Sequence, residues 1–385
     1  MITLCIPTKD RPLFLSRLLH YYARTHYQHW MFIGDSSGPA NAQRNQRTIA
    51  SFNGRLNISY WNDPSRSSCA FLEQMSQHLS TPYCAFVGDD DFLCTPALDQ
   101  YITFLEHRPE YSAVHGRGLM LQTEDSTPYG SIRSTKSYPQ AILRSDTGAE
   151  RLKEFFTVKP NALLYSVHRT GTWRDMFRGL SAMPGLQNQN IFKDELIPTA
   201  VSVIRGKVKE LEGLYLIRHM HDGIAWHPHV YDWVTDPIWF PSFQVFRDRV
   251  VEELQRQDGI SQEDAEVVFR QSFWLHLARE VTNAWRKQQI APARSPSKLR
   301  AFAKRLPGLR SGWRRMRSAI ERYRTARHDR EGFSLTALLR PSSPFHADFM
   351  PIYELITLPP NEVSYGGHFE NSRVGAVIVG AGQDG

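Results

Sequence analysis

The stretch Tyr83-Cys84-Ala85-Phe86-Val87-Gly88-Asp89-Asp90-Asp91-Phe92 decides how this chain is interpreted. Its first half is a short apolar run that ends in glycine, which is typical of a buried strand. Three aspartates follow at once, and carboxylates packed so tightly repel one another and raise one another's pKa. Either a divalent cation with oxygen ligands balances this cluster, or it is a solvated acidic turn in which an aspartate caps the next helix.

Short apolar runs alternate with helical patterns on both sides of this stretch, from residue 1 to about residue 118. Strands are predicted over residues 2–6, 30–34, 56–61, 83–87 and 112–115, and helices over 13–25, 70–79 and 98–107. This alternation predicts an α/β fold with a mainly parallel sheet and helices on both faces. Ligands bind beyond the carboxyl ends of the strands in such sheets, and the three aspartates lie at one of those ends.

The pattern after residue 118 is less regular. Residues 119–145 are polar and rich in turn formers, which predicts a mobile loop. Helices are predicted over 149–156 and 192–205, strands over 162–168 and 211–218, and a mainly helical region from about residue 236. The final segment is rich in glycine, so we expect its end to be frayed.

The composition is that of an ordinary soluble protein, with 41% hydrophobic and 22% charged residues in a chain of 385. No stretch has the roughly 18 uncharged apolar residues that a membrane-spanning helix needs. No basic region precedes the strand at residues 2–6, so we expect no cleavable leader. The four cysteines have no CxxC spacing, which predicts reduced thiols and a cytoplasmic protein.

The net charge of +7 originates in one segment. Residues 286–330 hold 15 Lys and Arg and two acids, a local net charge of +13, which leaves −6 for the rest of the chain. Apolar residues recur there every three or four positions, which predicts a basic amphipathic segment over residues 290–330. Three alternatives remain open: it lies on an anionic membrane surface, it packs on the protein or a second subunit, or it binds nucleic acid. The last is the least favoured, because no recognised binding module accompanies the segment.

Four segments, taken in order, resemble bacterial family-2-type glycosyltransferases with the GT-A fold. Residues 3–11 look like the opening of these enzymes, and residues 81–92 are similar to their DxD segment, in a subgroup that carries a DDDF version. Residues 190–196 and 206–216 resemble the later part of that subgroup. Aspartyl phosphatases and mutases need Asp-x-Asp-x-Thr, and nucleotidylyltransferases need a glycine-rich loop after the first strand. Neither pattern is present, but nucleotidylyl transfer is retained as an alternative.

The resemblance implies a GT-A-type Rossmann-like sandwich that moves a sugar from a nucleotide diphosphate sugar to an acceptor hydroxyl of a glycan or lipid-linked glycan. We then expect a catalytic domain over residues 1–235, with a nucleotide-sugar-binding half over 1–118 and an acceptor-side half over 119–235. A helical region over 236–345 and a partly disordered tail over 346–385 follow. Such an enzyme would act in the cytoplasm, at the inner face of the membrane where glycans of the bacterial envelope are assembled.

The resemblance also implies a divalent metal, Mn or Mg, at the three aspartates. Asp91 would ligate the metal, Asp89 would contact the donor ribose or a metal-bound water, and Asp90 is the less certain middle residue of the donor site. A histidine near the end of the last strand completes the metal shell in many such enzymes, and His221 is preferred over His219. Each histidine could equally be structural.

Other residues implied for the donor site follow the first three strands. Pro7, Thr8 and Arg11 would line the nucleotide slot. Asp35 would accept a hydrogen bond from the base or ribose, or else cap its own turn. Arg66 would pair with a phosphate or simply with Asp63 on the same rim.

The general base is implied at the acidic pair Asp194 and Glu195, with Glu195 preferred. One base and direct displacement would invert the anomeric carbon. The alternative for this pair is that acids in a first helical turn favour the helix dipole. A rival hypothesis from another class is a non-catalytic scaffold that binds an acidic partner through the basic segment.

Overall fold

The structure is a computed structural model, which describes residues 1–125, 127–157, 163–186, 191–221, 229–290 and 332–358. Within these residues, nine strands form one sheet in the order β3-β2-β1-β4-β8-β6-β9-β5, with β7 paired to β6. The strands are β1 (Ile2–Thr8), β2 (Trp30–Asp35), β3 (Asn57–Asn62), β4 (Tyr83–Phe86), β5 (Phe92–Leu93), β6 (Tyr111–Thr123), β7 (Ile132–Tyr138), β8 (Val167–Arg169) and β9 (Lys207–His219).

The sheet is mainly parallel, as the sequence predicts. Strands β3, β2, β1 and β4 run parallel, and so do β6 and β9. The antiparallel pairs involve β8, β5 and β7. Four parallel strands at one end of the sheet bring the loops after β1, β2, β3 and β4 to one edge, which is where an α/β sheet binds its ligands.

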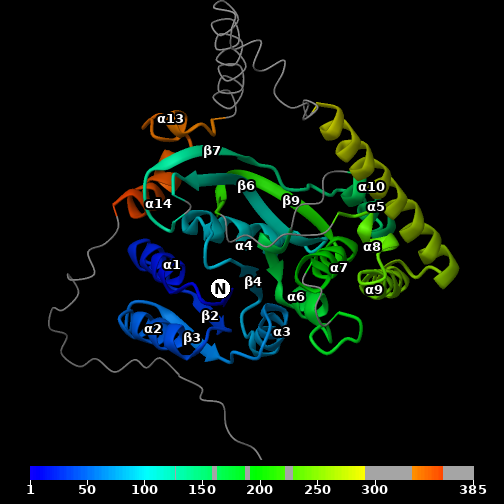
Figure 1. Cartoon of the computed structure of the whole chain (residues 1–385), viewed down its shortest axis with the longest axis horizontal. Coiled ribbons are helices and arrows are strands. Elements are labelled where there is room, and N and C mark those ends of the chain that lie inside the picture. Colours follow the sequence, from blue (N-terminus) through cyan, green and yellow to red (C-terminus); the bar gives the residue numbers. More distant parts are fainter. Residues whose placement is uncertain (126, 158–162, 187–190, 222–228, 291–331, 359–385) are drawn as a thin grey trace, which may run out of the picture.

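Helices cover both faces of this sheet (Figure 1). The helices are α1 (Pro12–Arg24), α2 (Pro39–Ala50), α3 (Ser68–His78), α4 (Leu98–His107), α5 (Gly148–Thr157), α6 (Thr170–Phe177), α7 (Ile197–Arg205), α8 (Asp232–Thr235), α9 (Phe240–Asp258), α10 (Gln262–Ile290), α13 (Leu335–Leu338) and α14 (His346–Thr357). Strand β1 shows why two layers form: Ile2, Leu4 and Ile6 enter one buried cluster, and Cys5 enters the other. Successive side chains of a strand point to opposite faces, so a fully apolar strand needs cover on both.

The region over residues 119–145, predicted as a loop, contains the end of one strand and the whole of another. Strand β6 continues to Thr123, and β7 returns antiparallel to it, with Gly118 opposite Tyr138. Most inward and outward positions of β7 are exposed or half-buried, with only Ile132 and Tyr138 buried at its ends. The hairpin therefore lacks the apolar alternation from which a strand is normally recognised, and its Thr and Ser content resembles a loop.

Three further differences concern helices. Helix α2 follows β2, where no helix is predicted. The predicted helix over residues 192–205 divides into a π-helical turn, η3 (Ile191–Leu196), and α7, with Pro198 in the first turn, where its missing N–H costs nothing. Helix α14 begins the segment expected to be a tail, and its Phe349, Ile352 and Ile356 lie in the same core cluster as α1.

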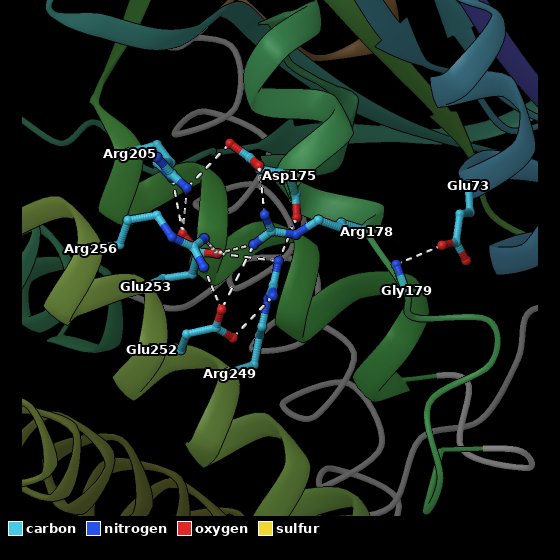
Figure 2. Close-up of polar contacts among 9 residues, drawn as sticks. All are labelled: Glu73, Asp175, Arg178, Gly179, Arg205, Arg249, Glu252, Glu253 and Arg256. Carbon is cyan, nitrogen blue, oxygen red and sulfur yellow. Dashed lines mark hydrogen bonds and ion pairs between the residues drawn. The ribbon is translucent and has the colours of Figure 1, made fainter. Parts of the chain in front are cut away.

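The helical region after residue 235 is packed into the second core cluster. Phe246 and Leu254 of α9 and Phe269 of α10 lie there with residues of α5, α6 and α7. Figure 2 shows Glu253 of α9 among arginines from the ends of α6 and α7. Within the described residues, no helix combines the length and apolarity that a membrane crossing requires. The basic segment over 290–330 lies almost wholly outside the described residues.

Candidate active site

The three aspartates Asp89, Asp90 and Asp91, here called the aspartate triplet, lie between the end of β4 and the start of β5. Strand β4 pairs in parallel with β1, so the residues after β1 lie beside the triplet. Thr8 ends β1 and donates a hydrogen bond from its hydroxyl to Asp89 Oδ2 at 2.7 Å. The loop after β1 and the triplet, about 80 residues apart in sequence, therefore form one site.

Each carboxylate of the triplet accepts hydrogen bonds from protein groups. Asp89 and Asp90 share Arg11, whose Nη1 lies 3.3 Å from Asp89 Oδ1 and 2.9 Å from Asp90 Oδ2. Asp90 Oδ2 also accepts from His221 Nε2 at 2.8 Å. Asp91 accepts from the Tyr165 hydroxyl at 2.6 Å, the backbone N–H of His219 at 3.0 Å and Arg218 Nε at 3.4 Å.

Exposure separates the middle aspartate from its neighbours. The Asp90 side chain is 17% exposed, against 5% for Asp89 and 1% for Asp91. Asp90, which the resemblance leaves as the least certain of the three, is thus the carboxylate most accessible to a ligand. Asp91, the implied direct metal ligand, is enclosed by its three donors.

Burial gives the carboxyl groups of the triplet unlike pKa values. Desolvation, followed by the charge of Asp90, raises the pKa of Asp89 to about 7 and that of Asp91 to about 6. Burial also opposes the charge of Asp90, but the hydrogen bond from His221 and the charge of Arg11 outweigh it and lower the Asp90 pKa. Asp90 is therefore the first carboxyl group of the triplet to ionise as the pH rises.

Two arginines that the sequence analysis does not single out also face the triplet. Arg17 of α1 is fully buried and donates to the Asp90 carbonyl at 2.6 Å, to the Pro128 carbonyl at 2.7 Å and to His219 Nδ1 at 2.8 Å. Its guanidinium also lies 4.7 Å from the centre of the Phe92 ring. Burial lowers the pKa of Arg17 to about 10, so it stays charged at neutral pH.

Arg218, near the end of β9, is the second of these arginines. Its guanidinium carbon lies 5.3 Å from the ring centre of Tyr138 and 5.0 Å from that of Tyr165, and both rings restrict its orientation. An arginine among the apolar residues of α1 and another directly after the buried run 214–217 of β9 are signals that the sequence alone offers. Both arginines interrupt an otherwise apolar pattern.

The two candidate histidines have different surroundings. His219 is buried, with Nδ1 accepting from Arg17 and Nε2 within 3.1 Å of the Thr123 hydroxyl, and burial lowers its pKa to about 3. Both of its ring nitrogens are therefore used within the protein, which is the structural alternative for this residue. His221 stacks on Phe14 at 4.8 Å between ring centres and donates to Asp90.

The outer donor-site candidates are held mainly by their own neighbours. Asp35 is fully buried and accepts from the Ser37 N–H, the Asn45 amide and the Tyr60 hydroxyl, each at 2.7 Å. This geometry matches the capping alternative for Asp35. Arg66 Nε lies 3.4 Å from Asp63 Oδ2, so these two residues pair with each other on the rim. Pro7 lies half-buried in β1, one residue before Thr8.

The acidic pair lies on η3, and its members face different neighbours. The charge of Asp194 acts on Cys69 of α3, whose thiol pKa is raised by burial first and then by this charge. Burial also raises the pKa of Tyr138, and the charges of Glu195 and Asp91 add to that effect. The charge of Glu195 is thus felt at Tyr138, whose ring contacts Arg218, and that of Asp194 at Cys69 of α3.

A metal requires several ligand atoms that converge on one point. Within the described residues, no group of three or more His, Cys, Asp or Glu side chains converges in this way. Carboxylates and imidazole are suitable donor types for Mn or Mg, but here their oxygens and nitrogens accept from or donate to protein groups. In this arrangement, guanidinium groups supply the positive charge near the triplet that the sequence analysis assigns to a metal.

No family model and no curated protein matches this chain. Among solved structures, it is similar to S. aureus TarS 1–349, with a TM-score of 0.46 and 11% identity over 74% of each chain. The same protein in complex with UDP-GlcNAc gives 0.44 and 14% over 76% of each chain. The mannosyltransferase PcManGT from Pyrobaculum calidifontis, in complex with GDP-Man and Mn²⁺, gives 0.39 and 10% over 82% of this chain and 84% of that chain.

Proposed function

We propose that this protein is a glycosyltransferase that moves a sugar from a nucleotide diphosphate sugar to an acceptor hydroxyl. The observation that supports this most is the hydrogen bonding between segments that resemble such enzymes. The first segment contacts the triplet through Thr8 and Arg11. Asp91 of the triplet accepts from the N–H of His219, three residues after the last of these segments. Segments about 80 and about 130 residues apart thus meet at the carboxyl ends of parallel strands.

The leaving group in this reaction is a nucleoside diphosphate, which gains negative charge as the glycosidic bond breaks. Arg11 and Arg218 are the partly exposed guanidinium groups beside the triplet, with 32% and 25% of their side chains exposed. Fixed guanidinium donors pair well with phosphate oxygens, and they stabilise charge that develops in a transition state. These two arginines therefore suit the diphosphate of the donor.

The acceptor hydroxyl must lose its proton, and we propose that the carboxylate of Glu195 is the general base that accepts it. Its charge acts on Tyr138, whose ring contacts Arg218 beside the triplet, whereas the charge of Asp194 acts on Cys69 of α3. A single base that activates the acceptor for direct displacement inverts the configuration of the transferred sugar. The acceptor we propose is a glycan or a lipid-linked glycan, and the membrane contact through residues 290–330 belongs to the same proposal.

Dependence on Mn or Mg is also a proposal, and no step above requires it. Bound at the triplet, a divalent ion would act as a Lewis acid on the diphosphate. Asp90 would be its most accessible ligand, since 17% of its side chain is exposed, and the more deeply buried His221 is bonded to it. Asp35, Asp63 and Arg66 remain proposed contacts of the nucleotide only if their present pairings open on binding.

The test measures which product a panel of nucleotide sugars releases. We expect nucleoside diphosphate, whereas pyrophosphate would indicate a nucleotidylyltransferase, and no turnover or nucleotide binding would contradict both. Glu195→Gln should lower kcat by about 10²–10⁴-fold with little change in the donor KM, the range for loss of a general base. Asp194→Asn is the matched control and should cost less than about tenfold. The opposite ranking would move the base to Asp194.

A further inference from the structure

Cationic side chains surround the aspartate triplet. Three carboxylates face three guanidinium groups: Arg11 bonds two of the carboxylates, Arg218 bonds the third, and Arg17 bonds the backbone of Asp90. Carboxylates buried this close together need positive charge beside them, because an unpaired buried charge is strongly destabilising. The arginines therefore do part of what a metal ion would do at an acidic cluster.

The three arginines differ in how firmly they are held. Arg17 is fully buried with three hydrogen-bond acceptors, and Arg218 lies between the rings of Tyr138 and Tyr165. Arg11 is the most exposed of the three, with 32% of its side chain exposed, and its Nη1 contacts both Asp89 and Asp90. Arg11 is thus the guanidinium that a ligand at the triplet would displace most readily.

The position of Arg11 is set by the residue before it. Asp10 has a positive φ of 54°, a left-handed conformation that is uncommon outside glycine, asparagine and aspartate. Its carboxylate accepts from the Gly38 N–H at 3.2 Å and the Asn41 amide at 3.0 Å, and its own N–H donates to the Ser37 hydroxyl at 2.7 Å. These contacts fix the turn after β1 against the loop after β2, and the turn directs Arg11 to the triplet.

We propose that Arg11 is the resident counter-cation of Asp89 and Asp90 and competes with divalent metal ions for these two carboxylates. A metal bridging them would lie about 2.0–2.6 Å from their oxygens, in the space where Arg11 Nη1 lies 2.9 Å and 3.3 Å from the same two residues. Both cations cannot occupy that space. A second consequence, which rests on the proposed function, is that a nucleoside diphosphate binds without metal because Arg11 already supplies positive charge.

The direct test is a titration of Mn²⁺ followed by the electron paramagnetic resonance signal of the free ion. Arg11→Gln should bind Mn²⁺ at least about tenfold more tightly than the wild type, a difference of about 1.4 kcal/mol. Arg44→Gln, which removes one charge from an exposed position of α2, is the matched control and should stay within about twofold. Adding Asp90→Asn to Arg11→Gln should abolish the gain and thereby locate the ion.

Equal or weaker Mn²⁺ binding by Arg11→Gln would overturn the proposal, as would the same gain in Arg44→Gln. Thermal denaturation first establishes that each variant is folded. Should Arg11→Gln not fold, Arg11→Met is the second neutral variant, since its aliphatic stem keeps the packing of the arginine near Phe14. We expect the same increase in Mn²⁺ affinity for Arg11→Met, and its absence would likewise overturn the proposal.

A second measurement separates this proposal from the proposed function. UDP and GDP should raise the melting temperature of the wild type in the presence of EDTA, because a ligand that binds only the native state stabilises it. Arg11→Gln should lose that shift in EDTA and regain it with Mn²⁺. A wild-type shift that strictly requires Mn²⁺ would refute metal-free binding. No shift by either nucleotide under any condition would contradict the proposed function, while the Mn²⁺ titration would still decide the competition.

Discussion

Gly88 determines how closely the carboxylates of the aspartate triplet can lie to the backbone of β4. A Cβ at this position would lie 2.7 Å from Asp90 Oδ1 and 3.3 Å from Asp91 Oδ2. The first distance is shorter than any normal van der Waals contact, so a side chain here would displace Asp90. The glycine is thus required by the charged cluster after it.

Gly88→Ala tests this requirement. We expect it to weaken binding of UDP or GDP by at least about tenfold, about 1.4 kcal/mol, because Asp90 would move away from Arg11 and His221. The fold should be kept, since the clash is with one side chain at the sheet edge. Gly38→Ala is the matched control, because a Cβ there meets nothing within 4 Å. Equal losses in nucleotide affinity for the two variants would contradict this account.

Single residues of the site were predictable to the extent that their chemistry is local. The aspartate triplet, Thr8 and Arg11 are recognisable from short segments, and the structure brings them together. Tyr165 and Arg218 were missed because they reach Asp91 across 74 and 127 residues. Their positions depend on how β8 and β9 pair within the sheet, and no spacing along the chain encodes that pairing.

At the scale of elements, strands β1 to β4 were predicted within two residues of their observed ends, and the β6–β7 hairpin was not. Strands β1, β2 and β4 carry continuous apolar runs because helices cover both of their faces. The β6–β7 hairpin has an open side, so its polar residues resemble a loop. Helix α2 was missed because its mostly polar sequence buries only Ala42, Asn45 and Ile49.

Strand β8 is short, but it lies between β4 and β6 and places a buried histidine there. His168 is fully buried, its Nε2 lies 3.0 Å from the Leu163 carbonyl, and its Nδ1 lies 3.2 Å from the Ser202 hydroxyl. Burial lowers its pKa to about 4. The unfolded chain takes up a proton near pH 6.5, but the folded protein does so only near pH 4. Hence the contribution of His168 to stability is complete above about pH 6.5 and is lost as the pH falls, by up to about 1.4 kcal/mol per pH unit.

His168→Gln should therefore destabilise the protein more at about pH 7.5 than at about pH 5, because only the wild type loses this contribution on acidification. At the higher pH we expect a loss of about 1–3 kcal/mol from the buried partners left unpaired. Urea unfolding at both pH values measures the difference. His107→Gln, on an exposed position of α4, should show no such convergence. A pH-independent cost for His168→Gln would contradict the assignment of a buried neutral histidine.

Helix α14 gives an element-scale prediction for the far end of the described chain. Phe349 is fully buried in the core cluster that also contains Leu15 and Leu18 of α1. Phe349→Ala should lower the free energy of unfolding by about 3–5 kcal/mol, as for other buried phenylalanines. Leu358→Ala, at a side chain that is 73% exposed, is the control and should change it by less than about 0.5 kcal/mol. Equally small losses in the free energy of unfolding for the two variants would mean that α14 does not belong to the core.

At the scale of the whole molecule, the two core clusters share one sheet, and ion pairs add to the packing between its helical layer and α9. Glu253 is fully buried and lies within 3.4 Å of four arginines: Arg178, Arg205, Arg249 and Arg256. Arg178 follows α6 and Arg205 ends α7, so a single carboxylate joins three helices (Figure 2). The region after residue 235 is thus coupled to the α/β body by a buried charge.

Removing the Glu253 carboxylate should lower the free energy of unfolding more than removing the neighbouring Glu252 carboxylate. Glu253→Ala leaves four guanidinium groups around an empty position, and breaking a buried ion pair in this way costs about 3–5 kcal/mol. Glu252, whose side chain is 50% exposed, contacts three of the same arginines. Because such exposed pairs contribute about 0–1 kcal/mol, Glu252→Ala is the matched control. Urea unfolding of both variants measures the difference, and equal losses would show that burial of Glu253 does not couple α9 to α6 and α7.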